Sequence, residues 1–243
     1  GIHPTLFRKT KTMKSKLKLT DHKILLTFGL LSRNKGVENV IKSLPAIVKK
    51  FPDVLYLVVG GTHPDVMRTE GEAYRTELRD LSRQLGMQDH VRFIDDYLPL
   101  TKILHYLQAT DIYISSSLDL NQAVSGTLSY ALGAGAAVIS TGFSQAKEVI
   151  TCDGGVIVPI GDSQAISRAS SKLLGDPQAL EMMRHSAYAS TRSMIWVNIA
   201  DNYAEKIAQL AKKSGHELKR LPQINMGHMA EMTSPYGFFQ FAN

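Results

Sequence analysis

The sequence has very little cysteine and no long hydrophobic run. Its 243 residues include a single cysteine, Cys152, which excludes an internal disulfide and a cysteine-based zinc site. No apolar run approaches the ~20 residues that a membrane-spanning helix needs, and no secretory signal pattern is visible. These absences fit a reducing compartment, and we expect a cytoplasmic protein.

Two common ligand signatures are also missing. The loop V-V-G-G-T-H-P, residues 58–64, lacks the G-x-G-x-x-G spacing of dinucleotide-binding folds, which disfavours an NAD site. His63 in the same loop has no histidine or cysteine at metal-ligand spacing. We therefore expect neither a metal site nor a bound cofactor.

Positive charge is concentrated at one end of the chain. The formal net charge is +6, yet residues 1–20 contain six basic side chains and no acidic one. The remaining 22 basic residues balance 22 acidic residues, so no basic face for nucleic acid is predicted. We expect residues 1–20 to be solvated; the alternative is contact with an anionic partner, such as a phosphate group or a membrane lipid surface. The six basic residues are Arg8, Lys9, Lys11, Lys14, Lys16 and Lys18.

Short apolar runs alternate with longer amphipathic stretches from Lys23 onward. The apolar runs predict strands at residues 24–28, 54–59, 91–94, 112–114, 137–140 and 156–158. Helical stretches between strands imply right-handed crossovers, so we expect an α/β domain with a parallel sheet of about six strands, covered on both faces. The predicted core includes Phe28, Val58, Phe93, Ile114 and Val138.

Composition divides the chain into three parts. Residues 1–21 form a basic lead-in, and residues 22–213 form the sheet-containing domain. Residues 214–243 form an irregular tail rich in Met and Phe, which we expect either to pack back or to lead toward a further domain. Ligands of parallel sheets bind beyond the carboxyl ends of the strands, so the strand-to-helix loops are the places to search for chemistry.

Two of these loops carry glycine, and the first also carries basic residues. The loop F-G-L-L-S-R-N-K-G, residues 28–36, contains Gly29 and Arg33 and places Lys35 at the start of a helix. A helix N-terminus attracts anions, and a lysine there adds a charge suited to phosphate, although an ordinary surface lysine is equally favoured. Gly61, in the next loop, allows close approach of a ligand or simply permits a tight turn.

The segment 112–141 predicts a strand, a polar loop, a helix and a second strand. Ser125, Gly126 and Thr127 fall where the helix begins, which predicts a phosphate-sized anion site. Tyr130, one turn later, is expected to point toward the same crevice. A tightly packed helix with Ser125 as its N-cap is the alternative. That alternative does not explain the preceding polar cluster of Asp119, Asn121 and Gln122.

Six sequence blocks, in order along residues 22–212, resemble the C-terminal, donor-binding domain of GT-B glycosyltransferases. They are F-G-L-L-S-R-N-K-G, V-V-G-G, V-R-F-I-D, A-T-D-I-Y-I-S-S, A-L-G-A-G-A-A-V-I-S-T preceded by Gln122 and Tyr130, and F-S-Q-A-K-E ending at Glu148. The family is the large retaining one that includes sucrose-, trehalose- and mannosyl-synthesising enzymes. The pattern Q…S-G-T-L-x-Y-A is similar to that of a bacterial subgroup. The resemblance implies a Rossmann-like, doubly wound parallel sheet.

The resemblance also implies roles for individual residues. Lys35, with Arg33 in place of the family arginine that falls on Leu30, would neutralise the departing nucleoside diphosphate together with the helix start at residues 125–127, without a metal. Gln122 and Tyr130 stand where the family has two glutamates; Gln122 would orient the donor sugar and Tyr130 would meet the ribose. Lys35 and Gln122 are thus the catalytic candidates. The other candidate substrate contacts are Gly29, Gly61, Asn121, Ser125, Gly126, Thr127 and Glu148.

The implied partners are a nucleotide-sugar donor and a carbohydrate or other acceptor. We expect the acceptor to bind an N-terminal half that is absent here, so this chain should bind donor but turn over little. Loss of both family glutamates favours an alternative, a non-catalytic nucleotide-sugar or carbohydrate-binding module of the same fold. A GT-B sugar-nucleotide epimerase is a further alternative. A phosphorylase would need a pyridoxal-phosphate lysine, for which the sequence offers no context.

Overall fold

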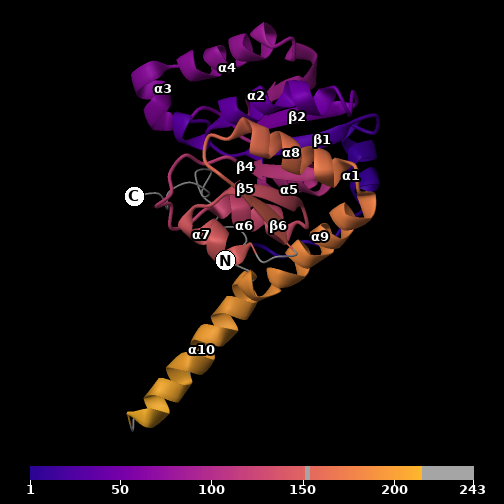
Figure 1. Ribbon diagram of the computed structural model, residues 1–243. Helices are drawn as coiled ribbons and strands as arrows, with labels where there is room; N and C mark the ends of the chain where they lie inside the picture. The colour runs from indigo at the N-terminus through magenta and orange to yellow at the C-terminus, as the bar shows by residue number, and fades with distance from the viewer. Residues whose placement is uncertain (151–153, 215–243) are drawn as a thin grey trace. The chain divides into compact units, whose positions relative to one another are not determined.

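A computed structural model describes residues 1–150 and 154–214 (Figure 1). Cys152 and the predicted tail at 214–243, apart from Ser214, lie outside the described residues. The chain divides into two compact units, residues 1–199 and 200–243. The sheet and the helices that cover it belong to the first unit. Within the described residues, no helix combines the length and hydrophobicity that crossing a membrane requires.

All neighbouring strands of the sheet run parallel, in the order β3-β2-β1-β4-β5-β6. The strands are β1 (Lys23–Phe28), β2 (Val54–Val59), β3 (Val91–Ile94), β4 (Ile112–Ser115), β5 (Ala137–Thr141) and β6 (Gly155–Val158). The central strands are continuously apolar because helices cover both of their faces. This architecture confirms the predicted α/β class and the parallel sheet of about six strands.

Helices cover the two faces of the sheet. On one face Ile24 and Leu26 of β1 pack in one core cluster with α5 and α6, whereas Leu25 between them packs with α2, α4 and α8 on the other. This alternation is the period-two geometry of a strand. The helices of the first unit are α1 (Thr10–Leu17), α2 (Val37–Val48), α3 (Pro64–Glu70), α4 (Ala73–Gln84), α5 (Leu100–Ala109), α6 (Gly126–Gly133), α7 (Ser144–Val149), α8 (Ser163–Leu174) and α9 (Pro177–Ser190).

The remaining elements are short or terminal. Single 3₁₀ turns lie at η1 (Arg33–Lys35), η2 (Gln88–His90) and η3 (Arg192–Met194). Helix α10 (Trp196–Lys213) begins in the first unit and continues into the second.

Four of the five predicted core residues are buried, and Phe93 is the exception. Phe28, Val58, Ile114 and Val138 lie in the two core clusters. Phe93 is only half-buried, although it packs against the core. The reason is its place on β3, which is an edge strand of the sheet and so has a neighbouring strand on one side only.

Residues 1–21, which the sequence sets apart as a basic lead-in, lie within the same compact unit as the sheet. Ile2 is buried and pairs with Ile195, and α1 packs on α5. The expectation of a solvated segment is wrong at Lys14, whose side chain is only 11 % exposed. Its ammonium lies 2.5 Å from the Asp111 carboxylate. The same carboxylate accepts a 2.6 Å hydrogen bond from the backbone N–H of Ile24 in β1.

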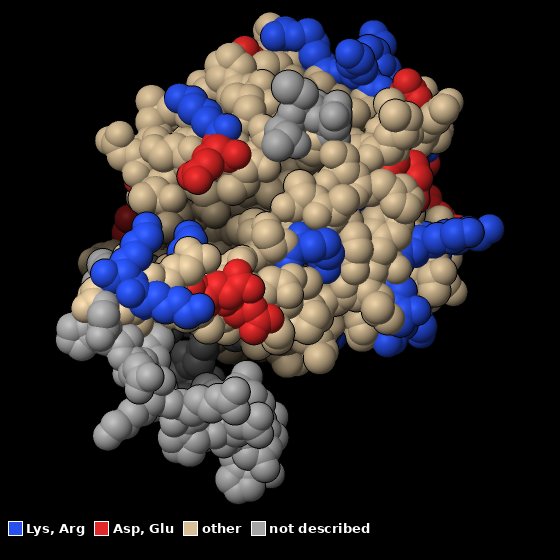
Figure 2. Space-filling view, turned by 90° about the horizontal axis from the view of Figure 1, so that it is seen from below, with Lys and Arg blue, Asp and Glu red and all other residues tan. Residues whose placement is uncertain are grey.

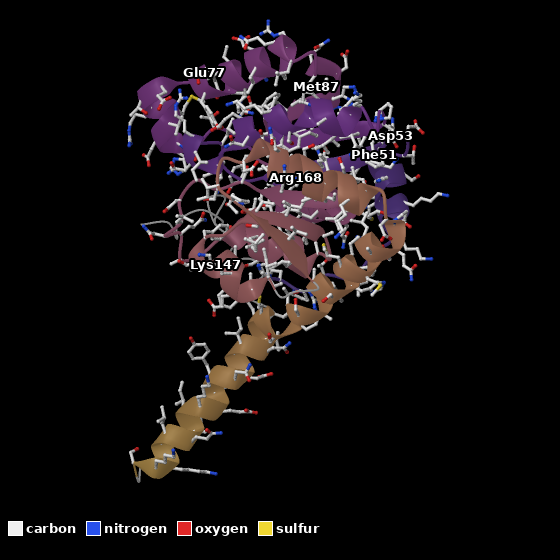
Figure 3. The ribbon with its side chains drawn as sticks, viewed as in Figure 1. Phe51, Asp53, Glu77, Met87, Lys147 and Arg168 are labelled. Carbon is white, nitrogen blue, oxygen red and sulfur yellow. The ribbon has the colours of Figure 1, made fainter. Side chains whose placement is uncertain are left out.

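This buried ion pair generates a stability prediction. Asp111→Ala leaves the Lys14 ammonium and the Ile24 N–H enclosed without their acceptor. We expect the free energy of unfolding to fall by about 3–5 kcal/mol, measured by chemical denaturation. The control is Asp53→Ala, which removes a surface partner of Lys23 (Figure 3), with both side chains more than a third exposed. The free energy of unfolding of that variant should fall by less than about 1 kcal/mol. Equal losses in the two variants would show that the Lys14–Asp111 pair does not anchor α1.

Candidate functional site

The candidate site lies where the chain reverses direction across the sheet. From β1 the chain builds outward through β2 and β3, and β4 then returns to pair with the other side of β1. The loops after β1 and β4 therefore follow the carboxyl ends of two adjacent strands. Such a switch point leaves a crevice in which open parallel sheets bind ligands.

The loop after β1 is fastened to the loop after β4 by backbone contacts. The hydroxyl of Ser116 donates to the carbonyl of Lys35 at 2.7 Å, and the N–H of Leu118 donates to the carbonyl of Asn34 at 2.9 Å. Gly36 has φ +60°, and a β-carbon there would overlap the carbonyl oxygen of Ser116. Only glycine fits this position, and the position of Lys35 is thereby tied to β4.

Three of the predicted site residues come together beyond the ends of β1 and β4. A β-carbon built on Gly29 would lie 3.1 Å from Cγ2 of Thr127 and 3.9 Å from the ammonium Nζ of Lys35. Gly29 has φ +137°, so a side chain there would strain the backbone as well as crowd the site. The loop after β1 and the first turn of α6 therefore lie close together at Gly29.

The electrostatics of Lys35 distinguish it from an ordinary surface lysine. Burial lowers the pKa of Lys35, and no neighbouring carboxylate in the described part of the chain raises it again. An enclosed ammonium without a counter-ion is unfavourable and gains stability from any anion that enters the site. Lys35 is half-buried, and its role toward an anion stays a prediction.

The N-terminus of α6 supplies a second group of anion-attracting donors. Ser125 caps the helix, because its hydroxyl accepts from the N–H of Leu128 at 3.3 Å. The N–H of Ser125 itself donates to the side chain of Gln145, so this predicted anion donor is already occupied. Among the hydrogen bonds of residues 1–150 and 154–214, none uses the N–H of Gly126 or Thr127. These two amides are the ones available to a ligand.

Gln145 holds the start of α6 in place from α7. Its amide nitrogen donates to the hydroxyl of Ser129 at 3.0 Å, and that hydroxyl donates to the carbonyl of Ser125 at 3.1 Å. Gln145 is buried and is not among the predicted site residues. The block F-S-Q-A-K-E contains it, but a carboxylate is expected there, and so the sequence directs attention to Glu148 instead.

Gln122 and Asn121 shape the loop between β4 and α6. The amide oxygen of Gln122 accepts from the hydroxyl of Ser117 at 2.9 Å, and its amide nitrogen donates to the carbonyl of Val124 at 3.1 Å. Asn121 is exposed, and its N–H donates to the Asp119 carboxylate at 2.9 Å. The Gln122 amide thus spans its own loop, and its role toward a sugar stays a prediction.

Arg33 is paired with two carboxylates, and its contact with a ligand stays a prediction. Its guanidinium forms two 2.8 Å hydrogen bonds to Glu77 of α4 (labelled in Figure 3) and one of 3.0 Å to Glu70 of α3. These two carboxylates raise the pKa of Arg33 above its ordinary value. Arg33 also lines a surface hollow of about 290 Å³ between α2 and α4, which shares no residue with the Gly29, Lys35 and Thr127 cluster.

The last three predicted residues lie at different depths. Tyr130 is buried in the core, where its side chain hydrogen-bonds the backbone of His3. Glu148 is exposed on α7. Gly61 accepts a 2.9 Å hydrogen bond from the N–H of Leu31, which joins the loops that come after β1 and β2. Ligand contacts of these residues stay predictions.

The family model of the glycosyl transferases group 1 matches residues 8–190. The chain belongs to this family. The chain is 28 % identical over 145 residues to phosphatidyl-myo-inositol mannosyltransferase of Mycolicibacterium smegmatis. This match covers 59 % of the chain and 34 % of that protein. It is 25 % identical over 198 residues to spore coat protein SA of Bacillus subtilis, a match that covers 80 % of the chain and 51 % of that protein. The group 1 chain spans about half the length, or less, of these relatives.

Solved structures share the fold of the group 1 chain at low sequence identity. The C-terminal domain of the group 1 glycosyl transferase LpcC from Francisella tularensis gives a TM-score of 0.67 at 21 % identity, covering 79 % of this chain and 94 % of that one. Anabaena HepE, solved in complex with UDP-glucose, gives a TM-score of 0.70 at 19 % identity. That match covers 85 % of this chain and 54 % of HepE. These likenesses confirm the predicted Rossmann-like α/β fold of GT-B glycosyltransferases.

Carboxylate, histidine and cysteine side chains are the candidate metal ligands in the part of the chain that the structure describes. No group of three or more His, Cys, Asp or Glu side chains there is arranged to hold an ion. The charges that the site does offer an anion are one ammonium and one helix N-terminus.

The backbone packing at the site yields a second prediction. Gly60 has φ +130°, and a β-carbon there would overlap the carbonyl oxygen of Gly29. We expect Gly60→Ala to lower the free energy of unfolding by about 3 kcal/mol, since strain and a backbone clash combine. Gly86→Ala is the matched control, because Gly86 has φ +68° with open space around it and should lose only about 1–2 kcal/mol. Equal losses, measured by denaturant titration, would mean that the two loops are not tightly packed.

Proposed function

We propose that this chain is the donor-binding half of a nucleotide-sugar-dependent glycosyltransferase. The observation that carries the proposal is the half-buried Lys35, which has no carboxylate partner among the described residues and lies with Thr127, in the first turn of α6, next to Gly29. A diphosphate fits this pair of features, because one lysine and two free helix amides complement its charge and its several acceptor oxygens. The complexed HepE structure supports a uridine diphosphate sugar as the first donor to test.

Catalysis in such an enzyme would depend on stabilising the leaving group. As the bond between the sugar and the diphosphate breaks, negative charge grows on the diphosphate oxygens. Lys35 and the amides of Gly126 and Thr127 would stabilise that charge from fixed positions without a metal ion, which is the electrostatic preorganisation typical of enzyme sites. Retention of the anomeric configuration is part of the proposal through the family resemblance.

The remaining roles concern the sugar, the ribose and the acceptor. Gln122 would orient the donor sugar, after giving up one of its contacts to Ser117 or Val124. Tyr130 is proposed to meet the ribose. The acceptor would bind a part of the protein other than this chain, and nucleic acid is not proposed as a partner. On the face that Figure 2 shows, basic side chains lie in separate groups, several of them beside acidic ones.

A second candidate is a binding module that has lost catalysis. It is favoured by one observation: Gln122 and Tyr130 occupy the positions of the family's two glutamates, so neither can supply a carboxylate. The amide of Gln122 is also committed to its own loop. A nucleotide-sugar-binding module would also use Lys35 and would differ from the transferase in not transferring the bound sugar. A carbohydrate-binding module would not require a nucleotide at Lys35.

The binding claim is tested by removing the ammonium. Lys35→Ala should weaken UDP and UDP-glucose binding at least tenfold, since a hydrogen bond to a charged group contributes about 1.5–3 kcal/mol. The matched control is Lys42→Ala, which removes an exposed lysine from α2 and should leave the affinity unchanged. Calorimetry on both folded variants gives the dissociation constants. Unchanged affinity in Lys35→Ala would contradict the phosphate assignment.

The pH dependence of the same measurement identifies the protonated group. Because burial lowers the pKa of Lys35, its ammonium loses its proton below the usual lysine range of about 10.4. Affinity for UDP should therefore decrease as pH rises toward that range, while phosphate groups, with a second pKa near ~6, stay ionised. Lys35→Arg keeps its charge and should bind UDP without this decrease. Parallel pH profiles of the two proteins would exclude Lys35 as the titrating contact.

A further inference from the structure

Arg75 forms a buried polar centre next to the candidate site. It lies on α4, its side chain is 1 % exposed, and its guanidinium reaches the carboxyl ends of β2 and β3. Its Nη2 donates to the carbonyl of Gly60 and to the hydroxyl of Thr62, both at 3.1 Å. The same nitrogen lies 2.7 Å from the Asp95 carboxylate.

Glu72 completes this centre and links it to the loop after β2. It accepts from Nε of Arg75 at 2.8 Å and from the hydroxyl of Thr62 at 2.9 Å. Burial alone would raise the pKa of Glu72, but the hydrogen bonds from Arg75 and Thr62 hold that pKa below its ordinary value. Glu72 therefore stays ionised at neutral pH, and Thr62 is held by both members of the ion pair.

This arrangement is not the one that stability alone would favour. Nη1 of Arg75 is buried and has no hydrogen-bond partner in the described part of the chain. An unpaired buried donor costs free energy, and buried ion pairs are often no more stabilising than apolar residues of the same size. What Arg75 does provide is a fixed geometry, because its planar guanidinium binds the loop at Gly60 and Thr62. Glu72, at the N-cap of the same helix, and Asp95, after β3, hold the guanidinium in place.

The gripped loop in turn braces the loop that carries Lys35. The N–H of Leu31 donates to the carbonyl of Gly61, and the N–H of His63 donates to the carbonyl of Leu31, each at 2.9 Å. Gly60 also lies close to Gly29, because a β-carbon built on Gly60 would lie 2.3 Å from the Gly29 carbonyl oxygen. Gly29 and Leu31 begin the loop that ends at Lys35.

We propose that Arg75 is a positioning residue for the candidate anion site, which sets the place of Lys35 through the loops after β2 and β1. The consequence for binding rests on the proposed function, whereas the consequence for loop order does not. Removal of the guanidinium geometry should loosen the Leu31–Gly61 and His63–Leu31 hydrogen bonds and weaken the site for a nucleoside diphosphate.

The test compares Arg75→Lys with Arg184→Lys in the full 243-residue chain. Arg184 is a close match: it is 2 % exposed, pairs with a glutamate three residues earlier, donates to a backbone carbonyl and has one buried nitrogen without a partner. Its partners are Glu181 on α9 and the carbonyl of Arg8, neither of which belongs to the loops after β1 and β2. Lysine keeps the charge in both variants but loses the planar grip.

Two measurements are made under conditions in which the unmodified chain and both variants are folded. Amide hydrogen exchange at Leu31 and His63 should be about tenfold faster in Arg75→Lys and unchanged in Arg184→Lys. Affinity for UDP, measured by calorimetry, should fall about tenfold in Arg75→Lys only. A general loss of stability would affect both variants alike. If Arg75→Lys does not fold, Asp95→Asn removes the charge of a partly exposed partner and should change both measurements in the same direction, less strongly.

The outcomes separate this inference from the proposed function. Normal exchange and normal UDP affinity in Arg75→Lys would overturn the positioning role while leaving the site intact. Equal effects in Arg184→Lys would overturn it too, since they would reflect stability. Failure of the unmodified chain to bind any nucleoside diphosphate would instead contradict the proposed function, and the exchange rates would still decide whether Arg75 orders the loop.

Discussion

Close packing of backbone on backbone at the carboxyl edge of the sheet is the constraint on which the site depends. Gly36 rests on the carbonyl of Ser116, and Gly60 rests on the carbonyl of Gly29, with no room for a β-carbon at either contact. Both glycines have positive φ, so the sequence there is restricted by conformation as well as by space. Three loops that are far apart in the chain are thereby held as one surface beyond β2, β1 and β4.

The basic side chains enclosed by this unit differ in how their charge is balanced. Lys14 has the Asp111 carboxylate, and Arg75 has both Glu72 and Asp95. Lys35 alone among these three has no carboxylate neighbour in the described residues, and it stands at the switch point of the sheet. Paired cations hold elements together, whereas an enclosed cation without a counter-ion attracts an anionic ligand. Under the proposed function, structural and binding roles would be divided in this way among residues of the same charge.

The sequence predicts the sheet well because each strand is a continuous apolar run between turn residues. It also predicts the loop that carries Lys35, since a lysine at a helix start after a strand has a local signal. It does not predict the role of Arg75, which lies in a charged amphipathic helix, because the partners of Arg75 come from other parts of the chain. The sequence places Lys14 in solvent for the same reason: Asp111 lies 97 positions away. Helix α3, between the second strand and the long charged helix, is also not predicted.

A crystal structure of this chain grown with UDP-glucose tests the central claim most directly. The account predicts that the diphosphate lies between the Lys35 ammonium and the N-terminus of α6, with phosphate oxygens about 2.7–2.9 Å from Nζ and within hydrogen-bond reach of the Gly126 and Thr127 amides. Phosphates bound instead against Arg33 in the hollow between α2 and α4, with Lys35 making no contact, would contradict it.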